Sequence, residues 1–167
     1  MRTPLRIEGE GNVVATTAAR TNMLKLVFPT LNSAVSTAEE LDAPLILVAE
    51  DHPDSRDALR SLLEVYGFRV EVAPDGRLAV EKAIVLRPDL VLMDIMMPDM
   101  DGFEATRALR ASSEFRQVPI VALTAMEGAR EMVLAAGCDD YLPKPIDVRS
   151  FLGRVRQWLD TGRVAAS

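Results

Sequence analysis

The chain has 167 residues, 49% of them hydrophobic and 26% charged, which is the size of one ordinary domain with some residues to spare. This size excludes a large multidomain enzyme, and the hydrophobic fraction excludes a chain that is disordered throughout. The formal net charge is -6, from 19 basic and 25 acidic residues, and it argues against a nucleic-acid binder because such a surface repels a phosphate backbone.

Residues 1–44 differ in composition from the rest of the chain. Thr, Ala, Asn and Ser are common there, and only the segment Met23–Phe28 is strongly apolar before Pro29. We expect an N-terminal extension that is largely flexible. Two alternatives stay open: translation begins at Met23, or the apolar segment forms a short docking element.

From Leu45 onward, apolar runs of strand length alternate with segments of helical periodicity, which is typical of βα units and a parallel sheet. Strands are predicted at residues 45–49, 68–73, 89–94, 119–123 and around 140–142. The continuous apolar run of the first strand is typical of a strand covered on both faces, whereas the alternation in the second is typical of an edge strand.

The segments between these strands predict five helices. They are expected from Pro53 to before Gly67, from Asp75–Gly76 to before Pro88, around Phe103–Leu109, up to about Ala136, and from around Phe151 to near Gly162. The inner faces of the first two should carry Leu59, Leu62, Leu63 and Tyr66, and Leu78, Ala79, Ala83, Ile84 and Leu86. Since the five βα units fill residues 45–162, we expect a short tail at residues 163–167 and no C-terminal output domain.

Polar residues follow the apolar runs at the strand ends. Glu50 and Asp51 follow the first strand, Asp94 ends the third, Thr124 closes the fourth, and Lys144 comes after the fifth. In an open parallel sheet, ligands bind where the loops leave the carboxyl ends of the strands. We therefore expect three acids, a hydroxyl and an ammonium to converge at one edge.

This set of side chains indicates phosphoryl chemistry at a metal ion. Three neighbouring carboxylates repel one another unless a cation lies among them, and oxygen ligands with few protein donors suit Mg²⁺ better than Ca²⁺. A divalent ion beside an aspartate would draw in a phosphoryl group, and the carboxylate would then act as nucleophile and form an acyl phosphate. Lys144 would pair with one phosphoryl oxygen, and the Thr124 hydroxyl would donate to another.

The residues at these strand ends resemble the receiver domain of two-component response regulators. The resemblance covers residues 45–162 and rests on the stretches Leu47–Asp51, Val91–Gly102, Ile120–Ala125 and Tyr141–Pro145. It implies an α/β, flavodoxin-like (βα)5 fold of three layers, with a five-stranded parallel sheet in the order 2-1-3-4-5.

The resemblance also implies roles for the site residues. Asp94 would accept the phosphoryl group from a histidine kinase or a histidine phosphotransfer protein. Mg²⁺ would be held by Asp51, Asp94 and the backbone carbonyl of Met96, and Glu50 would act on it through water. The chain would then be no enzyme beyond catalysing its own phosphorylation and dephosphorylation.

The family mechanism is a two-state switch. Phosphate on Asp94 would draw Thr124 inward and let Tyr141 turn from solvent into the space left behind. The surface formed by the fourth helix, fifth strand and fifth helix would then change its contacts with a downstream protein effector. The resemblance further implies a cis bond between Lys144 and Pro145, and a monomer or a phosphorylation-dependent dimer.

The lifetime of the acyl phosphate depends on the access of water to phosphorus. In this family, the residues two positions after Asp94 and after Thr124 border that approach, and here they are Met96 and Met126. Neither side chain can orient an attacking water, so we expect slow self-hydrolysis.

Competing interpretations concern the same sheet edge. One is a receiver-like binding module that does not depend on phosphorylation, or an intermediate receiver of a phosphorelay. A haloacid-dehalogenase-type phosphatase requires a second acid where Met96 stands. A flavodoxin requires a hydroxyl- and glycine-rich phosphate loop where Glu50 and Asp51 would repel the phosphate.

The rest of the sequence indicates a cytoplasmic protein. Cys138 is the only cysteine, which excludes an internal disulfide, and a single histidine excludes a multi-ligand zinc site. The sequence has no apolar run near the ~20 residues that span a bilayer and no segment of signal-peptide type. We expect neither a membrane nor a nucleic acid among its partners.

Overall fold

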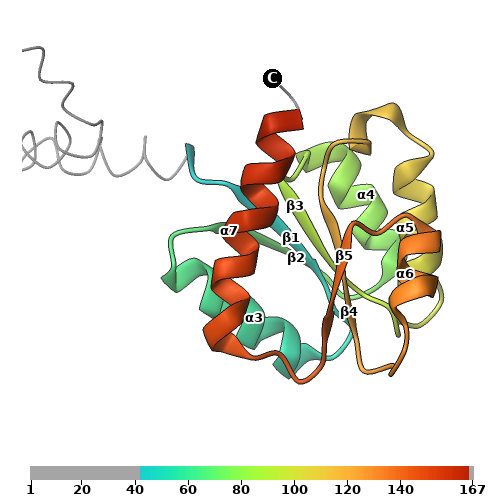
Figure 1. The fold of residues 1–167 in the computed structure, drawn as a ribbon, viewed down its shortest axis with the longest axis horizontal. Coiled ribbons are helices and arrows are strands. Elements are labelled where there is room, and N and C mark those ends of the chain that lie inside the picture. The colour runs from blue at the N-terminus through green and yellow to red at the C-terminus, as the bar shows by residue number, and fades with distance from the viewer. Residues whose placement is uncertain (1–41, 166–167) are drawn as a thin grey trace, which may run out of the picture. The chain divides into compact units, whose positions relative to one another are not determined.

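The computed structural model describes residues 42–165, which form an α/β domain (Figure 1). The expected extension at residues 1–44 lies outside the described residues up to residue 41. The elements in chain order are β1 (Leu45–Ala49), α3 (Pro53–Val65), β2 (Arg69–Ala73), α4 (Gly76–Leu86), β3 (Leu90–Asp94), α5 (Gly102–Arg110), the short 3₁₀ helix η2 (Ser113–Phe115), β4 (Ile120–Thr124), α6 (Arg130–Ala136), β5 (Asp140–Pro143) and α7 (Val148–Ala165). Among these helices, none combines the length and the apolar character that a bilayer crossing requires.

The five strands are parallel and lie in the order β2-β1-β3-β4-β5, so the fold expected from the sequence is confirmed. β1 lies between β2 and β3, with Ile46 paired to Val70 on one side and to Leu90 on the other. The order therefore reverses beside β1, and an open sheet of this kind places its binding crevice at that reversal.

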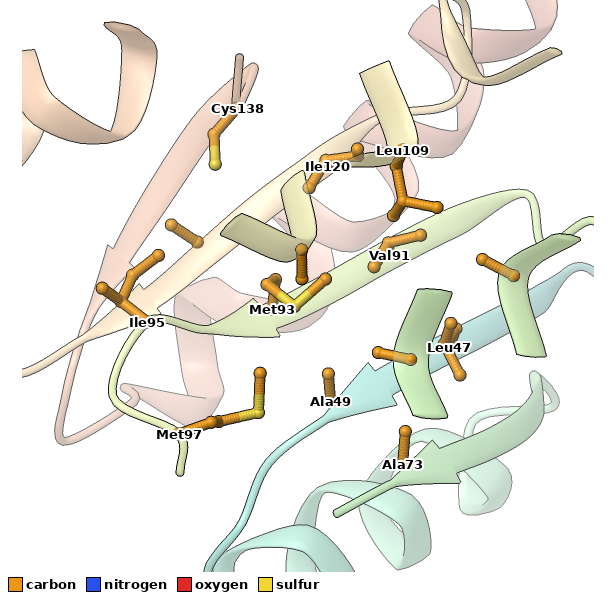
Figure 2. Packing of buried hydrophobic residues seen from close by; sticks show 14 of the residues in the cluster. Leu47, Ala49, Ala73, Val91, Met93, Ile95, Met97, Leu109, Ile120 and Cys138 are labelled. Carbon is orange, nitrogen blue, oxygen red and sulfur yellow. The ribbon is translucent and has the colours of Figure 1, made fainter. Parts of the chain in front are cut away.

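Helices cover both faces of the sheet, as Figure 1 shows for α3 and α7 on one side and α4, α5 and α6 on the other. Side chains alternate along β1: Leu47 and Ala49 belong to the cluster under α4, α5 and α6, while Ile46 and Val48 belong to the cluster under α3 and α7. Figure 2 shows the first cluster, in which Val91 and Met93 of β3 lie beside Leu47 and Ala49. Burial on both faces explains the continuous apolar run of β1.

Three residues expected on inner helix faces are largely exposed. Tyr66 is 49% exposed, Ile84 51% and Leu86 40%. In α4, the small side chains of Ala79 and Ala83 lie against the sheet, and Ile84 is turned about 100° away from Ala83. Leu86 is the last residue of that helix, and Tyr66 follows the last residue of α3, so neither has a further turn to bury it. The prediction was wrong at these three positions.

Two further features differ from the expectation. Helix α7 continues to Ala165, so residues 163–165 belong to the helix and not to a tail. The turn η2 was not predicted, because three residues are too few to show a period. It buries Phe115, which is 1% exposed, against the core.

Candidate functional site

Three acidic side chains meet at the carboxyl edge of the sheet. Glu50 and Asp51 come directly after β1, and Asp94 is the last residue of the adjacent strand β3. One carboxylate oxygen from each lies within 4.8 Å of the others. Glu50 and Asp94 are buried, at 1% and 4% exposure, while Asp51 is exposed to solvent. The site therefore has a buried floor and an open side.

Lys144 reaches this cluster from the loop after β5. Its Nζ lies 2.6 Å from Glu50 Oε2 and 2.6 Å from Asp94 Oδ2, so one ammonium joins both buried carboxylates. Burial acts to lower the pKa of Lys144, but the hydrogen bonds and charges of the two acids outweigh it and raise the pKa above its ordinary value. Lys144 is therefore charged at neutral pH.

Glu50 makes contacts that the sequence did not predict. Its Oε2 binds Lys144 directly, and its Oε1 accepts a hydrogen bond of 3.3 Å from the His52 amide. Its action on the metal ion through water stays a prediction. Burial is the largest influence on Glu50 and raises its pKa above the ordinary value. The Lys144 hydrogen bond offsets part of this rise, and the charge of Asp94 adds to it.

The loop after β3 holds the second oxygen of Asp94. The Met96 amide donates a hydrogen bond of 2.9 Å to Asp94 Oδ1, and the Met96 side chain is 64% exposed. Gly102 closes the loop, since its amide donates to Ile95 O at 3.1 Å and a Cβ at this position would overlap the Asp94 carbonyl oxygen. The role of the Met96 carbonyl as a metal ligand stays a prediction.

Thr124 and Tyr141 lie on the neighbouring strands. Thr124 ends β4 with 1% exposure, and its Oγ1 accepts a hydrogen bond of 3.0 Å from the Met126 amide. Tyr141 lies in β5, is partly buried and packs against the core cluster. The Lys144–Pro145 bond is cis, and the Lys144 amide donates to Thr124 O at 2.8 Å. The switching roles of the two residues stay predictions.

The sequence analysis missed Arg56, which lies near the start of α3. Its Nη1 donates to the backbone oxygens of Glu50 and Asp51, at 2.9 Å and 3.1 Å. A basic residue near a helix N-terminus is unfavourable in the field of the helix dipole. The presence of a basic residue at this position was therefore the signal in the sequence that Arg56 has a specific partner.

An apolar cavity of about 770 Å³ opens beside the site. It lies between α3 and the loop that leads from β5 into α7, and it reaches Glu50 and Lys144. The other lining residues are Ser55, Ala58, Leu59, Leu62, Ala125, Pro145, Ile146 and Val148. Sequence periodicity did not reveal it, because its walls come from segments far apart in the chain.

The donor set fits a hard divalent cation. Three carboxylates face one ammonium, and even with the Arg56 guanidinium counted the cluster keeps a negative charge. In the part of the chain that the structure describes, no hydrogen bond or ion pair engages the Asp51 carboxylate, so it is available to a ligand. All donors are oxygens and one side is open to water, which are the features that Mg²⁺ prefers.

Comparison with known proteins gives a consistent result. The family model for the response regulator receiver domain matches residues 46–156. Response regulator MprA of Mycolicibacterium vanbaalenii is 44% identical over 116 residues, which are 68% of this chain and 49% of that protein. Its counterpart in Mycobacterium leprae is 42% identical over 116 residues, 68% of this chain and 50% of that protein. The chain thus spans about half the length of the curated relatives it matches.

Solved structures of the same kind superpose on the domain. The receiver domain of sensor histidine kinase PA1611 from Pseudomonas aeruginosa PAO1, which has a magnesium ion coordinated in its active-site cleft, gives a TM-score of 0.66 at 39% identity. The match covers 71% of this chain and 98% of that one. Chemotaxis response regulator CheY4 of Vibrio cholerae gives 0.66 at 31% identity, over 69% of this chain and 98% of that one.

Proposed function

Since this chain belongs to the family of response regulator receiver domains, we propose that it accepts a phosphoryl group on Asp94 from a histidine kinase or a histidine phosphotransfer protein in a Mg²⁺-dependent reaction. The observation that carries the proposal is the setting of Asp94. Its carboxylate is buried at the end of β3, with Lys144 on one oxygen and the Met96 amide on the other. Both contacts hold in place the carboxylate that would act as the nucleophile.

The transfer exchanges a P–N bond for a P–O bond. An Asp94 oxygen bonds to phosphorus as the donor imidazole leaves, and the product is an acyl phosphate. Lys144, whose side chain is 25% exposed, would then release Asp94 and pair with a phosphoryl oxygen. The buried Thr124 hydroxyl would donate to another phosphoryl oxygen.

Asp51, Asp94 and the Met96 carbonyl would hold the metal ion, and Glu50 would act on it through water. The acidic cluster and the magnesium ion of the Pseudomonas aeruginosa neighbour support this assignment. Bound there, Mg²⁺ supplies positive charge that offsets the repulsion between the carboxylates and the incoming phosphoryl oxygens. The chain itself catalyses only its own phosphorylation and dephosphorylation.

The apolar cavity beside the site supports a helical donor. Its lining includes Leu59 and Leu62 of α3, Ile146 and Val148 after β5, and Lys144 of the site. An amphipathic helix that carries the phosphohistidine would bury its apolar side chains there and bring the imidazole to Asp94. Such docking positions the reactants before transfer.

The output would be a change in protein contacts on the face formed by α6, β5 and α7. Movement of Thr124 toward the phosphoryl group would make room for Tyr141, which now lies partly buried in β5. The curated relatives are about twice as long as the matched region. The action on a separate protein effector is therefore proposed for this chain and is not taken from those relatives.

A second candidate is an intermediate receiver of a phosphorelay. It is favoured by the Pseudomonas aeruginosa neighbour, which is the receiver domain of a sensor histidine kinase. In that case the phosphoryl group on Asp94 would pass on to a histidine phosphotransfer protein. Mixing the phosphorylated chain with such a protein distinguishes the two candidates, because a relay receiver loses its label to the histidine far faster than to water.

The first test is intact-mass spectrometry after incubation with acetyl phosphate and Mg²⁺. We expect an adduct of about 80 Da on the wild type, absent after Asp94→Asn and absent when the metal is chelated. Asp99→Asn is the matched control, because Asp99 is an exposed aspartate in the same loop and should leave the adduct unchanged. An unmodified wild type, or an adduct that survives Asp94→Asn, overturns the proposal.

A further inference from the structure

Arg56 folds back over the start of its own helix. It is the fourth residue of α3 and is half-buried, and its Nη1 donates 2.9 Å to Glu50 O and 3.1 Å to Asp51 O. These two carbonyls belong to consecutive peptide units in the loop between β1 and α3. One guanidinium nitrogen therefore joins the helix to the acidic loop.

The choice of partners is unusual for an arginine near three carboxylates. Arginine commonly pairs with carboxylate oxygens, often with two parallel hydrogen bonds. Among the described residues, the hydrogen bonds of the Arg56 side chain run to main-chain oxygens instead. As a result, Arg56 contributes to the site without occupying the carboxylate oxygens that a cation would need.

The two bonds fix the peptide planes on either side of the Asp51 Cα. The Glu50 carbonyl belongs to the plane before Asp51, and the Asp51 carbonyl belongs to the plane after it. Because peptide units are planar, holding both carbonyls restrains the two backbone dihedrals of Asp51. Only the side-chain torsions of Asp51 then stay free.

Asp51 depends on this support more than Glu50 does. The Glu50 amide donates 3.0 Å to Ala73 O, and the Glu50 carboxylate binds Lys144 and the His52 amide. The Asp51 carboxylate, as noted above, has no partner among the described residues. The range of positions that the carboxylate can reach is therefore set by the backbone, which the Arg56 side chain helps to hold.

We infer that Arg56 is a positioning residue for the cation site, which orients the Asp51 carboxylate through the two peptide planes. The inference rests on the proposed function, since it assumes that the site binds Mg²⁺. Charge and geometry make opposite predictions here. Removing a positive charge beside a cation site should tighten Mg²⁺ binding by Coulomb's law, whereas loss of the oriented loop should weaken it.

The test uses the full chain and Mg²⁺ alone. Mg²⁺ affinity is measured from amide chemical shifts in NMR titrations of the wild type, Arg56→Gln and Arg56→Lys. We expect Arg56→Gln to weaken binding by about 10- to 100-fold, the usual loss when a group that orients a metal ligand is removed. Arg56→Lys should recover part of it, because an ammonium can still donate to both carbonyls. ¹⁵N relaxation should also show lower order parameters at the Asp51 and His52 amides of Arg56→Gln, below the roughly 0.85 of a rigid backbone.

Arg60→Gln is the matched control. Arg60 lies one turn further along α3 and pairs at 2.9 Å with Glu64 on the exposed face. It should leave the Mg²⁺ affinity and the two order parameters unchanged. Thermal unfolding of each metal-free variant separates the inference from a general loss of stability, since a merely structural role lowers the melting temperature without weakening Mg²⁺ binding in the folded protein.

The outcomes distinguish the inference from the function it rests on. A wild type that does not bind Mg²⁺ overturns the proposed function. A wild type that binds, together with a folded Arg56→Gln that binds equally well or more tightly, overturns only the role of Arg56. If Arg56→Gln does not fold, Arg56→Met, which keeps an aliphatic stem, is judged by the same criteria.

Discussion

Lys144 binds Glu50 and Asp94 at equal distances of 2.6 Å, although it lies 94 positions after the first and 50 positions after the second in the sequence. The two acids are buried at the ends of β1 and β3, and the lysine comes from the loop after β5. A buried carboxylate without a partner is costly, and two beside each other are more so. The ammonium therefore stabilises the fold and the site together.

We predict that Lys144→Met lowers the free energy of unfolding by about 2 kcal/mol in the absence of metal. Removing one partner of a fully buried ion pair costs roughly 3–5 kcal/mol, and partial exposure of Lys144 reduces that figure. Mg²⁺ should restore part of the loss, because a bound cation replaces the ammonium among the carboxylates. Urea unfolding with and without Mg²⁺ measures both effects.

Lys82→Met serves as the control for this prediction. Lys82 pairs with Glu71 at 3.0 Å on the surface, where an ion pair contributes about 0–1 kcal/mol. Its removal should change the unfolding free energy little, with or without Mg²⁺. Equal effects of the two substitutions would contradict the role assigned to Lys144.

We predict that Tyr141→Ala leaves the rate of Asp94 phosphorylation unchanged but reduces the response of the output face. Tyr141 packs on the core from β5, and in the described part of the chain no hydrogen bond links it to the three carboxylates. The measurement is the set of amide shift changes in α6, β5 and α7 when the chain is phosphorylated. A normal set of shifts in Tyr141→Ala excludes Tyr141 as part of the switch.

Slow loss of the phosphoryl group is the third prediction. Met96 and Met126 are 64% and 37% exposed, so both can border the approach of water to phosphorus, and neither can polarise it. The double substitution Met96→Asn with Met126→Glu should speed hydrolysis about tenfold or more, since positioned acid–base groups typically contribute about 10²–10⁴. The decay of the intact-mass adduct gives the rate. Leucine at both positions is the control and should leave the rate of hydrolysis unchanged. If the polar pair also leaves the rate unchanged, the two methionines do not slow the hydrolysis.

Asp140 gives a prediction about pH. It accepts hydrogen bonds from Arg154, at 2.7 Å, and from the Trp158 indole, at 2.9 Å, and thereby holds β5 to α7. Burial acts to raise the pKa of Asp140, but these bonds and the one from the Tyr141 amide outweigh it and lower the pKa below the ordinary 3.8. A group with a lowered pKa stabilises the fold above its ordinary pKa and loses that contribution as the pH falls through the lower value.

The stability difference between the wild type and Asp140→Asn should therefore be constant from neutral pH down to about pH 5 and shrink below about pH 4. We expect a plateau of about 1 kcal/mol, because the site is partly exposed. Denaturant unfolding across this pH range measures it. Asp160→Asn, an exposed acid on α7, should show no such change. A difference that grows as the pH falls contradicts the assignment.

The buried strands were predictable because their chemistry is local. A strand covered on both faces must be apolar throughout, and Leu45–Ala49 and Leu90–Met93 satisfy this in sequence alone. The strand order was predicted from the resemblance. The residues at the strand ends could then be placed at one edge of the sheet. To predict that these residues meet, only one rule was needed: the carboxyl ends of parallel strands lie at the same edge of the sheet.

The missed features depend on side-chain direction. Ile84 follows Ala83 on α4 and was placed inside by its apolar character, but the rotation of the helix exposes it. The contacts of Arg56 and Lys144 depend on their side-chain rotamers, which the hydrophobic periodicity of the sequence does not predict. The direct contact of Lys144 with Glu50 joins the loops after β5 and β1, which come close only when the sheet has formed.

The most direct measurement of the central claim is the position of the acyl phosphate. The phosphorylated chain is treated with borohydride, which reduces an aspartyl phosphate to homoserine, and its peptides are sequenced by mass spectrometry. We predict homoserine at position 94 alone, and only when the chain has met both a phosphodonor and Mg²⁺. Homoserine at position 51 or 99, or none at position 94, would contradict the account.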